Sequence, residues 1–388
     1  MTSRTVVFSQ SCLVNILVPN LGSTSLKYQL IEFPSEKVLS TGHLERIGLP
    51  GGDAKDHREA ITQVLQLSDP IHGVGFKAVH GGPKYRGTFR VDDELLAAMQ
   101  NYKIAAPLHN DIYLSALEIF RSLRPELPLV AVFETSFHRT LPEYASYYGV
   151  PQEWVNQFGI RKYGFHGASH RYVSEQVPKI LEALPENLQL ISCHLGGSSS
   201  ICAIDGGRSV DVSMGFSPQS GVENATRHGD LDVFAVLAVM DQLDCSSMAM
   251  REQLLNKGGL AGISGIAGGD VRDLERSASQ GDERALLALE TFAYEIRKTI
   301  GSYAAAMGGI NALAFTGGIG ENSASLRATV CQELGLLGIG LDPVENLHGL
   351  GDRLISYEHL PVKVVVLKTN EEVIVARETK KLLQSKPA

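Results

Sequence analysis

The chain has 388 residues, which suits two or three domains with a substantial buried core. Its 44% hydrophobic and 20% charged residues are ordinary for a soluble globular enzyme, and the formal net charge of −8 argues against a nucleic acid or a membrane as the main partner. The five cysteines are scattered without CxxC spacing, which predicts a reducing compartment, the cytoplasm, and no zinc-type site.

The first predicted elements are two strands joined by a polar turn. An apolar run over residues 14–18 stops at Pro19 and Asn20, the small residues 22–25 turn the chain, and a second run begins at Leu26. Backbone N–H groups in Gly/Ser turns form concave sites for anions, and hydroxyl groups add donors without bulk. The turn therefore favours an anionic ligand.

Strand-like and helical runs alternate along the rest of the chain. The sequence KAVHGG at 77–82 precedes a helical run at 92–102, and the apolar segments 128–136, 188–197, 312–320 and 362–370 each precede or follow further helical runs. This alternation predicts an α/β protein whose helices cover mixed sheets.

One internal similarity concerns the polar turns. NLGSTSLKYQLIE at 20–32 and HLGGSSSICAIDGG at 194–207 both show Leu-Gly, a run of small residues rich in hydroxyl groups, and then a strand. Two copies about half a chain apart suggest a duplicated domain with one polar hairpin in each half. The alternative is two unrelated β-turns, because turn residues are common.

A third polar turn, FTGGIGENS at 315–323, follows a strand and precedes a helix. It is not a Walker loop, because no Gly-Lys-Ser/Thr closes it, and it does not match the full dinucleotide fingerprint. Alone it says little, but three such turns in one chain favour a phosphorylated ligand.

Two side chains stand out as candidates for contact with that ligand. His166 lies between Phe165 and Gly167 just before a helix, so a loop can present its ring, whereas most of the other histidines are interpreted as packing residues. Arg227 lies among small residues and can point into a cleft. Its alternative is a surface salt bridge with Asp230 or Asp232.

The segment TNEE at 369–372 follows an apolar strand. Thr369 and Glu372 have the spacing of a capping box, which places Glu371 and Glu372 in the first turn of a helix. These carboxylates either simply favour the helix dipole, or one of them faces a cleft and holds Mg²⁺ directly or through water.

Together these segments resemble the acetate kinase family, within the sugar kinase and actin-like ATPase superfamily. The resemblance runs in order from residue 14 to about residue 383. It is carried by NLGSTSLKYQL, VHGG, APLHN, FETSFHRTLP, YGFHGASH, HLGGSSS, SMGFSP, TRHGDLD, GISG, DVRDL, FTGGIGENS and TNEE.

The resemblance implies two duplicated RNase H-like domains around an interdomain cleft. We expect residues 1–136 with 373–388 to form the first domain and residues 137–372 the second. It also implies a homodimer and a carboxylate kinase that reversibly transfers the γ-phosphate of ATP to acetate, giving acetyl phosphate and ADP. The cofactor would be Mg²⁺, with Mn²⁺ as an alternative.

The resemblance also assigns roles to individual residues, and five groups follow from it. The catalytic group is Glu134, His166 and Arg227. Lys77 binds substrate, and the pocket for the acetate methyl group is Val79, Leu108, Phe165 and Pro218. The metal ligands are Asn20 and Glu371. The nucleotide-binding residues are Lys27, His194, Leu195, Gly196, Gly197, Ser198, Asp270, Val271, Arg272, Gly318, Ile319, Gly320, Glu321 and Asn322.

Several positions depart from the family pattern. Lys77 replaces an arginine, Glu134 an aspartate and Gly197 an asparagine, and QSGVENATR at 219–227 replaces LEGLxMGTR. A lysine cannot make the bidentate contact of an arginine, and a shift of a catalytic group by ~1 Å can cost about 10²-fold in rate. Three alternatives therefore stay open: a nucleotide-binding member with weakened turnover, propionate as the acceptor, and another phosphoryl donor such as pyrophosphate.

Overall fold

The computed structural model describes residues 13–103 and 107–385, apart from the side chains of residues 107–110. The chain divides into two compact units, one formed by Met1–Arg139 with Asn370–Ala388 and the other by Thr140–Thr369. The sequence suggested divisions after residues 136 and 372. Glu371 thus belongs to the first unit, together with Lys77 and Glu134.

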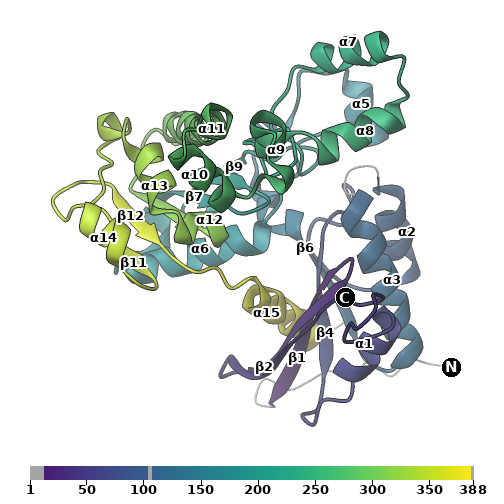
Figure 1. Cartoon of the computed structure of the whole chain (residues 1–388). Coiled ribbons are helices and arrows are strands. Elements are labelled where there is room, and N and C mark those ends of the chain that lie inside the picture. Colours follow the sequence, from purple (N-terminus) through teal and green to yellow (C-terminus); the bar gives the residue numbers. More distant parts are fainter. Residues whose placement is uncertain (1–12, 104–106, 386–388) are drawn as a thin grey trace. The chain divides into compact units, whose positions relative to one another are not determined.

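The first unit is built on a six-stranded sheet with the order β3-β2-β1-β4-β6-β5 (Figure 1). Strands β1, β4 and β6 are parallel, and β2, β3 and β5 pair antiparallel with their neighbours. The elements are β1 (Val14–Gly22), β2 (Ser25–Phe33), β3 (Lys37–Leu44), α1 (His57–Val64), β4 (Gly73–Ala78), β5 (Thr88–Arg90), α2 (Asp93–Asn101), α3 (Pro107–Leu123), β6 (Leu129–Phe133), the 3-10 helix η1 (Glu134–Thr140) and α15 (Glu371–Gln384).

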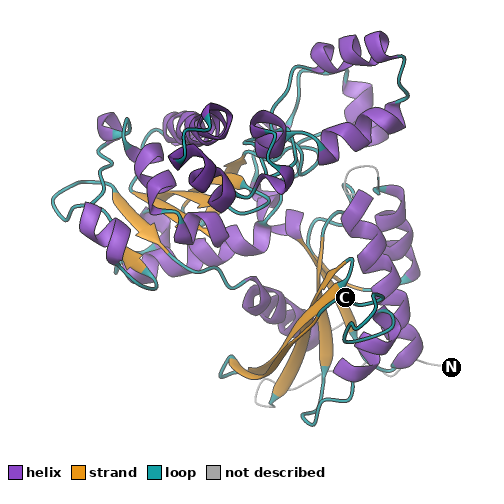
Figure 2. Ribbon diagram, in the orientation of Figure 1, coloured by secondary structure: helices purple, strands orange, loops and turns teal. Residues whose placement is uncertain are grey.

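Side chains of β1 alternate between the two faces of this sheet, as the pleat requires. Leu17 belongs to the core shared with α1, α2 and α3, whereas Ile16 and Val18 pack with Val375 and Leu383 of α15. Helices therefore cover both faces of the sheet, as Figure 2 shows. This packing holds the first turn of α15 next to β4.

The second unit contains another six-stranded sheet, with the order β11-β12-β10-β7-β8-β9. Helix α11 covers one face and buries Phe292, Ile296 and Ile300 against Ile191 and Ile201. The elements are α4 (Glu143–Ser146), α5 (Gln152–Phe158), α6 (Gly167–Ile180), η2 (Pro185–Asn187), β7 (Gln189–His194), β8 (Ser200–Asp205), β9 (Arg208–Val212), α7 (Val233–Leu243), α8 (Ser247–Asn256), α9 (Gly259–Ser264), η3 (Ala267–Gly269), α10 (Val271–Ser279), α11 (Glu283–Met307), β10 (Ala312–Thr316), α12 (Gly317–Asn322), α13 (Ala324–Cys331), η4 (Gly335–Leu337), α14 (Pro343–His348), β11 (Arg353–Leu354) and β12 (Lys363–Val366).

The two sheets share one topology. In each, the strands taken in chain order are arranged third, second, first, fourth, sixth, fifth, with the same parallel and antiparallel pairs. Each also has a register shift between its second and third strands, at Leu30/Ile31 and at Ala203/Ile204. The similar polar turns are therefore the first hairpins of two copies of one α/β unit, and the predicted duplication is confirmed.

Two local expectations were wrong. The segment FTGGIGENS, expected as a polar turn, is mostly helical, because residues Gly317–Asn322 form the short helix α12, which leads into α13. The cap of α15 is Asn370 rather than Thr369, since the Asn370 side chain accepts a hydrogen bond from the N–H of Val373 at 3.0 Å. Glu371 and Glu372 do occupy the first turn of that helix.

Within the described part of the chain, no single helix combines the length and apolar character needed to cross a membrane. Helices α7 and α8 meet the criterion only as a pair, and they are bent by 120° at the break between them.

Candidate active site

The first polar hairpin brings two predicted residues together. Asn20 on β1 and Lys27 on β2 are direct partners in the strand register, and both line a hollow of about 340 Å³ that Glu372 and His43 also border. Strand pairing thus places an amide and an ammonium group on one surface near the start of α15.

Lys77, Glu134 and Glu371 form a half-buried cluster in the same unit. Lys77 is on β4, Glu134 directly follows the neighbouring parallel strand β6, and Glu371 begins α15. The Lys77 Nζ atom lies 2.5 Å from Glu371 Oε2 and 3.6 Å from Glu134 Oε1. Burial works against the ammonium form, but the two carboxylates raise the pKa of Lys77 well above its ordinary value. Lys77 therefore stays charged.

The chemistry of this unit suits a magnesium ion bound through few protein ligands. Mg²⁺ prefers oxygen, which the Asn20 amide and the Glu371 carboxylate provide, and it usually keeps waters and substrate phosphates as its other ligands. Among the described residues, no group of three or more His, Cys, Asp and Glu side chains is arranged to hold a metal by itself. In this structure Glu371 Oε2 is engaged by Lys77, and the carboxylate that borders the hollow beside Asn20 is Glu372.

The four residues expected around a methyl group are divided between the units. Val79 follows β4 and is 6% exposed, and Leu108 belongs to α3, but its side chain lies outside the described part. Phe165 and Pro218 are buried in the second unit.

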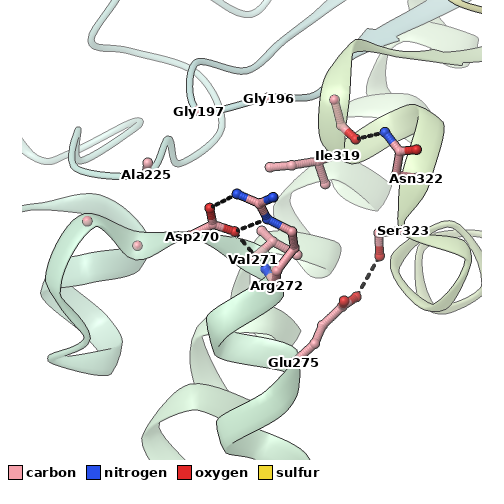
Figure 3. A pocket seen from close by; sticks show the side chains of 13 residues that line it. Gly196, Gly197, Ala225, Asp270, Val271, Arg272, Glu275, Ile319, Asn322 and Ser323 are labelled. Atoms are coloured by element: carbon pink, nitrogen blue, oxygen red, sulfur yellow. Dashed lines mark hydrogen bonds and ion pairs between the residues drawn. The ribbon is translucent and has the colours of Figure 1, made fainter. Parts of the chain in front are cut away.

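A pocket of about 680 Å³ opens in the second unit (Figure 3). The predicted residues that line it are Gly196, Gly197, Asp270, Val271, Arg272, Gly318, Ile319 and Asn322. Its lining also includes residues that the sequence did not single out: Ala225, Gly268, Gly269, Glu275 and Ser323. The predicted residues His194, Leu195, Ser198, Gly320 and Glu321 are not part of the lining.

Leu195 has a supporting role beside this pocket. It is fully buried, and its carbonyl oxygen accepts hydrogen bonds from the N–H groups of Ile319 and Gly320 at 2.9 and 3.1 Å. Gly317 has φ +78°, and a Cβ there would meet the Leu195 carbonyl oxygen at 2.6 Å. The second hairpin and helix α12 are thus held together where only glycine fits.

Asp270 and Arg272 form an ion pair at the pocket wall, with Arg272 Nη2 2.6 Å from Asp270 Oδ2 (Figure 3). Hydrogen bonds from the Arg272 side chain and N–H lower the pKa of Asp270 to about 2. Glu275 accepts hydrogen bonds from Ser323 at 2.6 Å and from Ser325 at 2.5 Å, which joins α10 to the start of α13.

His166 occupies the position just before α6, with a left-handed backbone at φ 55° and ψ 29°. Its Nδ1 atom lies 2.8 Å from the Ser200 hydroxyl oxygen, and its ring centroid lies 4.3 Å from that of His194. The Nδ1 atom of His194 lies 2.7 Å from the hydroxyl oxygen of Ser169. A left-handed conformation is uncommon for a residue with a side chain, and such strain is concentrated at functional sites.

Arg227 links two groups of predicted residues. Its Nη1 atom donates to the Ser198 hydroxyl at 3.0 Å and to the Pro218 carbonyl at 3.3 Å. Asp230 and Asp232, the partners in the surface salt-bridge alternative, accept hydrogen bonds from the backbone N–H groups of Gly221 and Phe234.

Sequence reasoning missed the groups behind His166. His170 follows it by four residues in YGFHGASH, so both begin the same helix, and that spacing was the available signal. Ser200 ends the small-residue run of the second hairpin. Nothing local marked it, because strand pairing brings it to His166 across 34 residues.

Comparison with known proteins gives a consistent result. The model of the acetokinase family matches residues 55–377. The acetate kinase of Halalkalibacterium halodurans is 42% identical over 389 residues, covering 94% of this chain and 99% of that protein. The propionate kinase of Citrobacter rodentium is 44% identical over 392 residues, covering 95% and 96%. The crystal structure of Porphyromonas gingivalis acetate kinase has a TM-score of 0.86 at 35% identity, covering 95% of this chain and 100% of that one.

Proposed function

The chain belongs to the acetokinase family, and from this premise we propose that it is an acetate kinase, which reversibly transfers the γ-phosphoryl group of ATP to acetate. The observation that carries the proposal is the position of Arg227. One guanidinium contacts both Ser198, expected at the nucleotide, and Pro218, expected at the acetate methyl group. A phosphoryl group that passes between nucleotide and acetate would lie beside such a cation.

In the proposed reaction, an acetate oxygen forms a bond to the γ-phosphorus as the bond to the bridging oxygen of ADP breaks. A carboxylate is already a nucleophile, so the site needs positioned positive charge and hydrogen-bond donors rather than a strong base. His166 and Arg227 would stabilise the charge on the transferred group. Lys77, held between Glu134 and Glu371, supplies a fixed positive charge in the first unit.

We propose Mg²⁺, or Mn²⁺ in its place, as the metal, with Asn20 and Glu371 as its protein ligands. When bound with the nucleotide, the ion would neutralise charge on the phosphates. Lys27, the strand partner of Asn20, adds a cation to the same hairpin.

The nucleotide is proposed to occupy the pocket of the second unit, where Gly196, Gly197 and Gly318 allow close approach to the backbone. Asp270 and Arg272 form its opposite wall (Figure 3). His194, Leu195, Ser198, Gly320 and Glu321 would act from beside the pocket.

Propionate is a second candidate acceptor. The similarity to a propionate kinase at 44% identity favours it, and the residues proposed for the acyl pocket of this chain, Val79, Leu108, Phe165 and Pro218, are all apolar. One methylene in such a pocket changes preference by only about 1–3 kcal/mol.

We further propose that the protein acts as a homodimer in the cytoplasm. Helix α7 buries none of its residues within the chain, and Phe234, Leu237 and Leu243 are 78%, 47% and 58% exposed. An apolar surface of this kind is typical of an interface, and a second copy is the proposed partner.

The test is acyl phosphate formation by purified protein with Mg²⁺ and ATP, trapped with hydroxylamine, in parallel reactions with acetate and propionate. We expect product with acetate at a kcat of about 1–10³ s⁻¹. Product with propionate but not with acetate would identify propionate as the acceptor. Product only when pyrophosphate replaces ATP would identify pyrophosphate as the donor. No product with any pair, together with retained ATP binding, would support the nucleotide-binding alternative.

A further inference from the structure

Three fully buried polar side chains form a connected series behind His166. Ser200 Oγ lies 2.8 Å from His166 Nδ1 and 2.7 Å from Nε2 of His170. The other ring nitrogen of His170, Nδ1, lies 2.9 Å from the hydroxyl oxygen of Ser192. Ser192, Ser200 and His170 are each 0% exposed. The series therefore runs from the core of the second unit to a residue of the proposed site.

The burial of His170 restricts where its proton can be. An imidazolium is costly to bury, and the ring nitrogens of His170 lie against two hydroxyl groups, which a neutral ring satisfies with one nitrogen that donates and one that accepts. Ser200 has one hydroxyl proton and contacts two rings, so it donates to one ring and accepts from the other. The whole series consequently has a direction, and that direction decides whether Nδ1 of His166 accepts or donates.

His166 itself is in a position that disfavours its charged form. It directly precedes α6, a helix of 14 residues, and the positive end of the helix dipole opposes an added positive charge. Of the two tautomers of a neutral ring, the one with hydrogen on Nε2 accepts from Ser200 at Nδ1 and the one with hydrogen on Nδ1 donates to Ser200, so the distances by themselves allow both directions.

We propose that Ser200 and His170 are positioning residues that hold His166 as the Nε2–H tautomer. Ser192 donates to His170 Nδ1, His170 Nε2–H donates to Ser200, and Ser200 donates to His166 Nδ1. In that tautomer the hydrogen on Nε2, on the side of the ring away from Ser200, is the one that would donate to a phosphoryl oxygen. The direction of the series is chosen from the proposed function, because a donor to a phosphoryl oxygen needs hydrogen on Nε2, and the tautomer can be measured without any assay of activity.

The tautomer is measured by ¹H–¹⁵N correlation spectra of the full chain with ¹⁵N-labelled histidine, and the His166 signals are identified from their loss in His166→Gln. We expect the wild type to carry hydrogen on Nε2. Ser200→Ala should populate the Nδ1–H form and lower kcat by about 10–100-fold, with the KM values for ATP and acetate changed by less than about threefold. Ser200→Thr, which keeps the hydroxyl group, should restore the tautomer and most of the rate.

Ser174→Ala is the matched control. Ser174 is a buried serine like Ser200, but it lies on α6 and its hydroxyl donates to the carbonyl of Arg171. It should leave the His166 tautomer unchanged. A wild-type His166 with hydrogen on Nδ1, or an unchanged tautomer in Ser200→Ala, would overturn the proposal. If the wild type phosphorylates no carboxylate, the proposed function fails, and the spectra still decide the tautomer.

Discussion

Lys77 has two acidic neighbours, which lie at different distances from its ammonium group. Its Nζ atom is 2.5 Å from Glu371 but 3.6 Å from Glu134. The resemblance to the family implies arginine and aspartate where this chain has Lys77 and Glu134. An ammonium group is a compact point charge, whereas a guanidinium is a planar fork. The smaller cation of Lys77 is therefore matched by the longer side chain of Glu134, and the two changes are expected to depend on one another.

We expect Lys77→Arg and Glu134→Asp to be coupled. The double variant should increase acetate turnover more than the two single changes predict together, because charged groups in contact rarely act additively. Acyl phosphate formation by the wild type, both single variants and the double variant measures this. Additive effects in an active enzyme would contradict the expectation, and inactivity of all four proteins would favour the nucleotide-binding alternative.

His166 and Arg227 should matter for the chemical step more than for binding. We expect His166→Ala and Arg227→Ala each to lower kcat by about 10²–10³, the usual effect of losing a preorganised donor. Steady-state kinetics gives kcat, and calorimetric titration with ATP should show binding within a few-fold of the wild type. Near-normal turnover in either variant would remove that residue from the mechanism.

At the scale of elements, the carbonyl group of Leu195 joins the second hairpin to helix α12. Two glycines at this junction differ in the space around them. A Cβ at Gly317 would meet the Leu195 carbonyl oxygen at 2.6 Å, whereas a Cβ at Gly197 would meet no atom within 4 Å. Only the first glycine is required by packing, so Gly197 is a departure from the family pattern that the fold does not impose.

Gly197→Asn, which restores the family residue, should therefore fold normally and lower the KM for ATP. A Cβ at this position meets no atom within 4 Å, and an amide there would add a donor beside the proposed nucleotide site. The KM for ATP and the melting temperature are the measurements. Gly197→Ala is the control without an amide and should leave the KM unchanged. An unchanged KM in Gly197→Asn would show that this position does not contact the nucleotide.

At the scale of the whole molecule, one topology occurs twice, and the residues proposed for one reaction are divided between its two copies. Lys77, Glu134 and Glu371 belong to the first, and His166 and Arg227 to the second. The second copy also carries the long insertion that contains α7, whose apolar side chains are exposed.

The proposed homodimer predicts that charges on α7 separate the subunits. We expect Phe234→Glu combined with Leu237→Glu to shift the mass in solution from dimer to monomer, because a carboxylate is costly to bury in an apolar interface. Light scattering after size-exclusion chromatography measures the mass. Leu350→Glu alters a side chain outside α7 that is 92% exposed and should leave the mass unchanged. A dimer that persists in the α7 variant would place the interface elsewhere.

Much of the local structure follows from the sequence alone. The alternation of apolar runs and turns predicted the α/β class, and the similarity of residues 20–32 to residues 194–207 predicted the duplicated hairpins that the two sheets contain. These features depend on neighbours in the chain, because pleat, helix periodicity and turn chemistry are set over a few residues. Even there the cap of α15 was misplaced by one residue, since Thr369 and Asn370 are both acceptable caps and packing decides between them.

The partners of each side chain were decided by the tertiary structure. Lys77 contacts Glu371 across 294 residues, and Ser200 contacts both His166 and His170 only because β8 pairs with β7 beside α6. No local pattern contains such contacts, because strand order and register bring together residues that are far apart in the chain. Sequence by itself determined which residue types were available for phosphoryl transfer, and tertiary structure decided which of them touch.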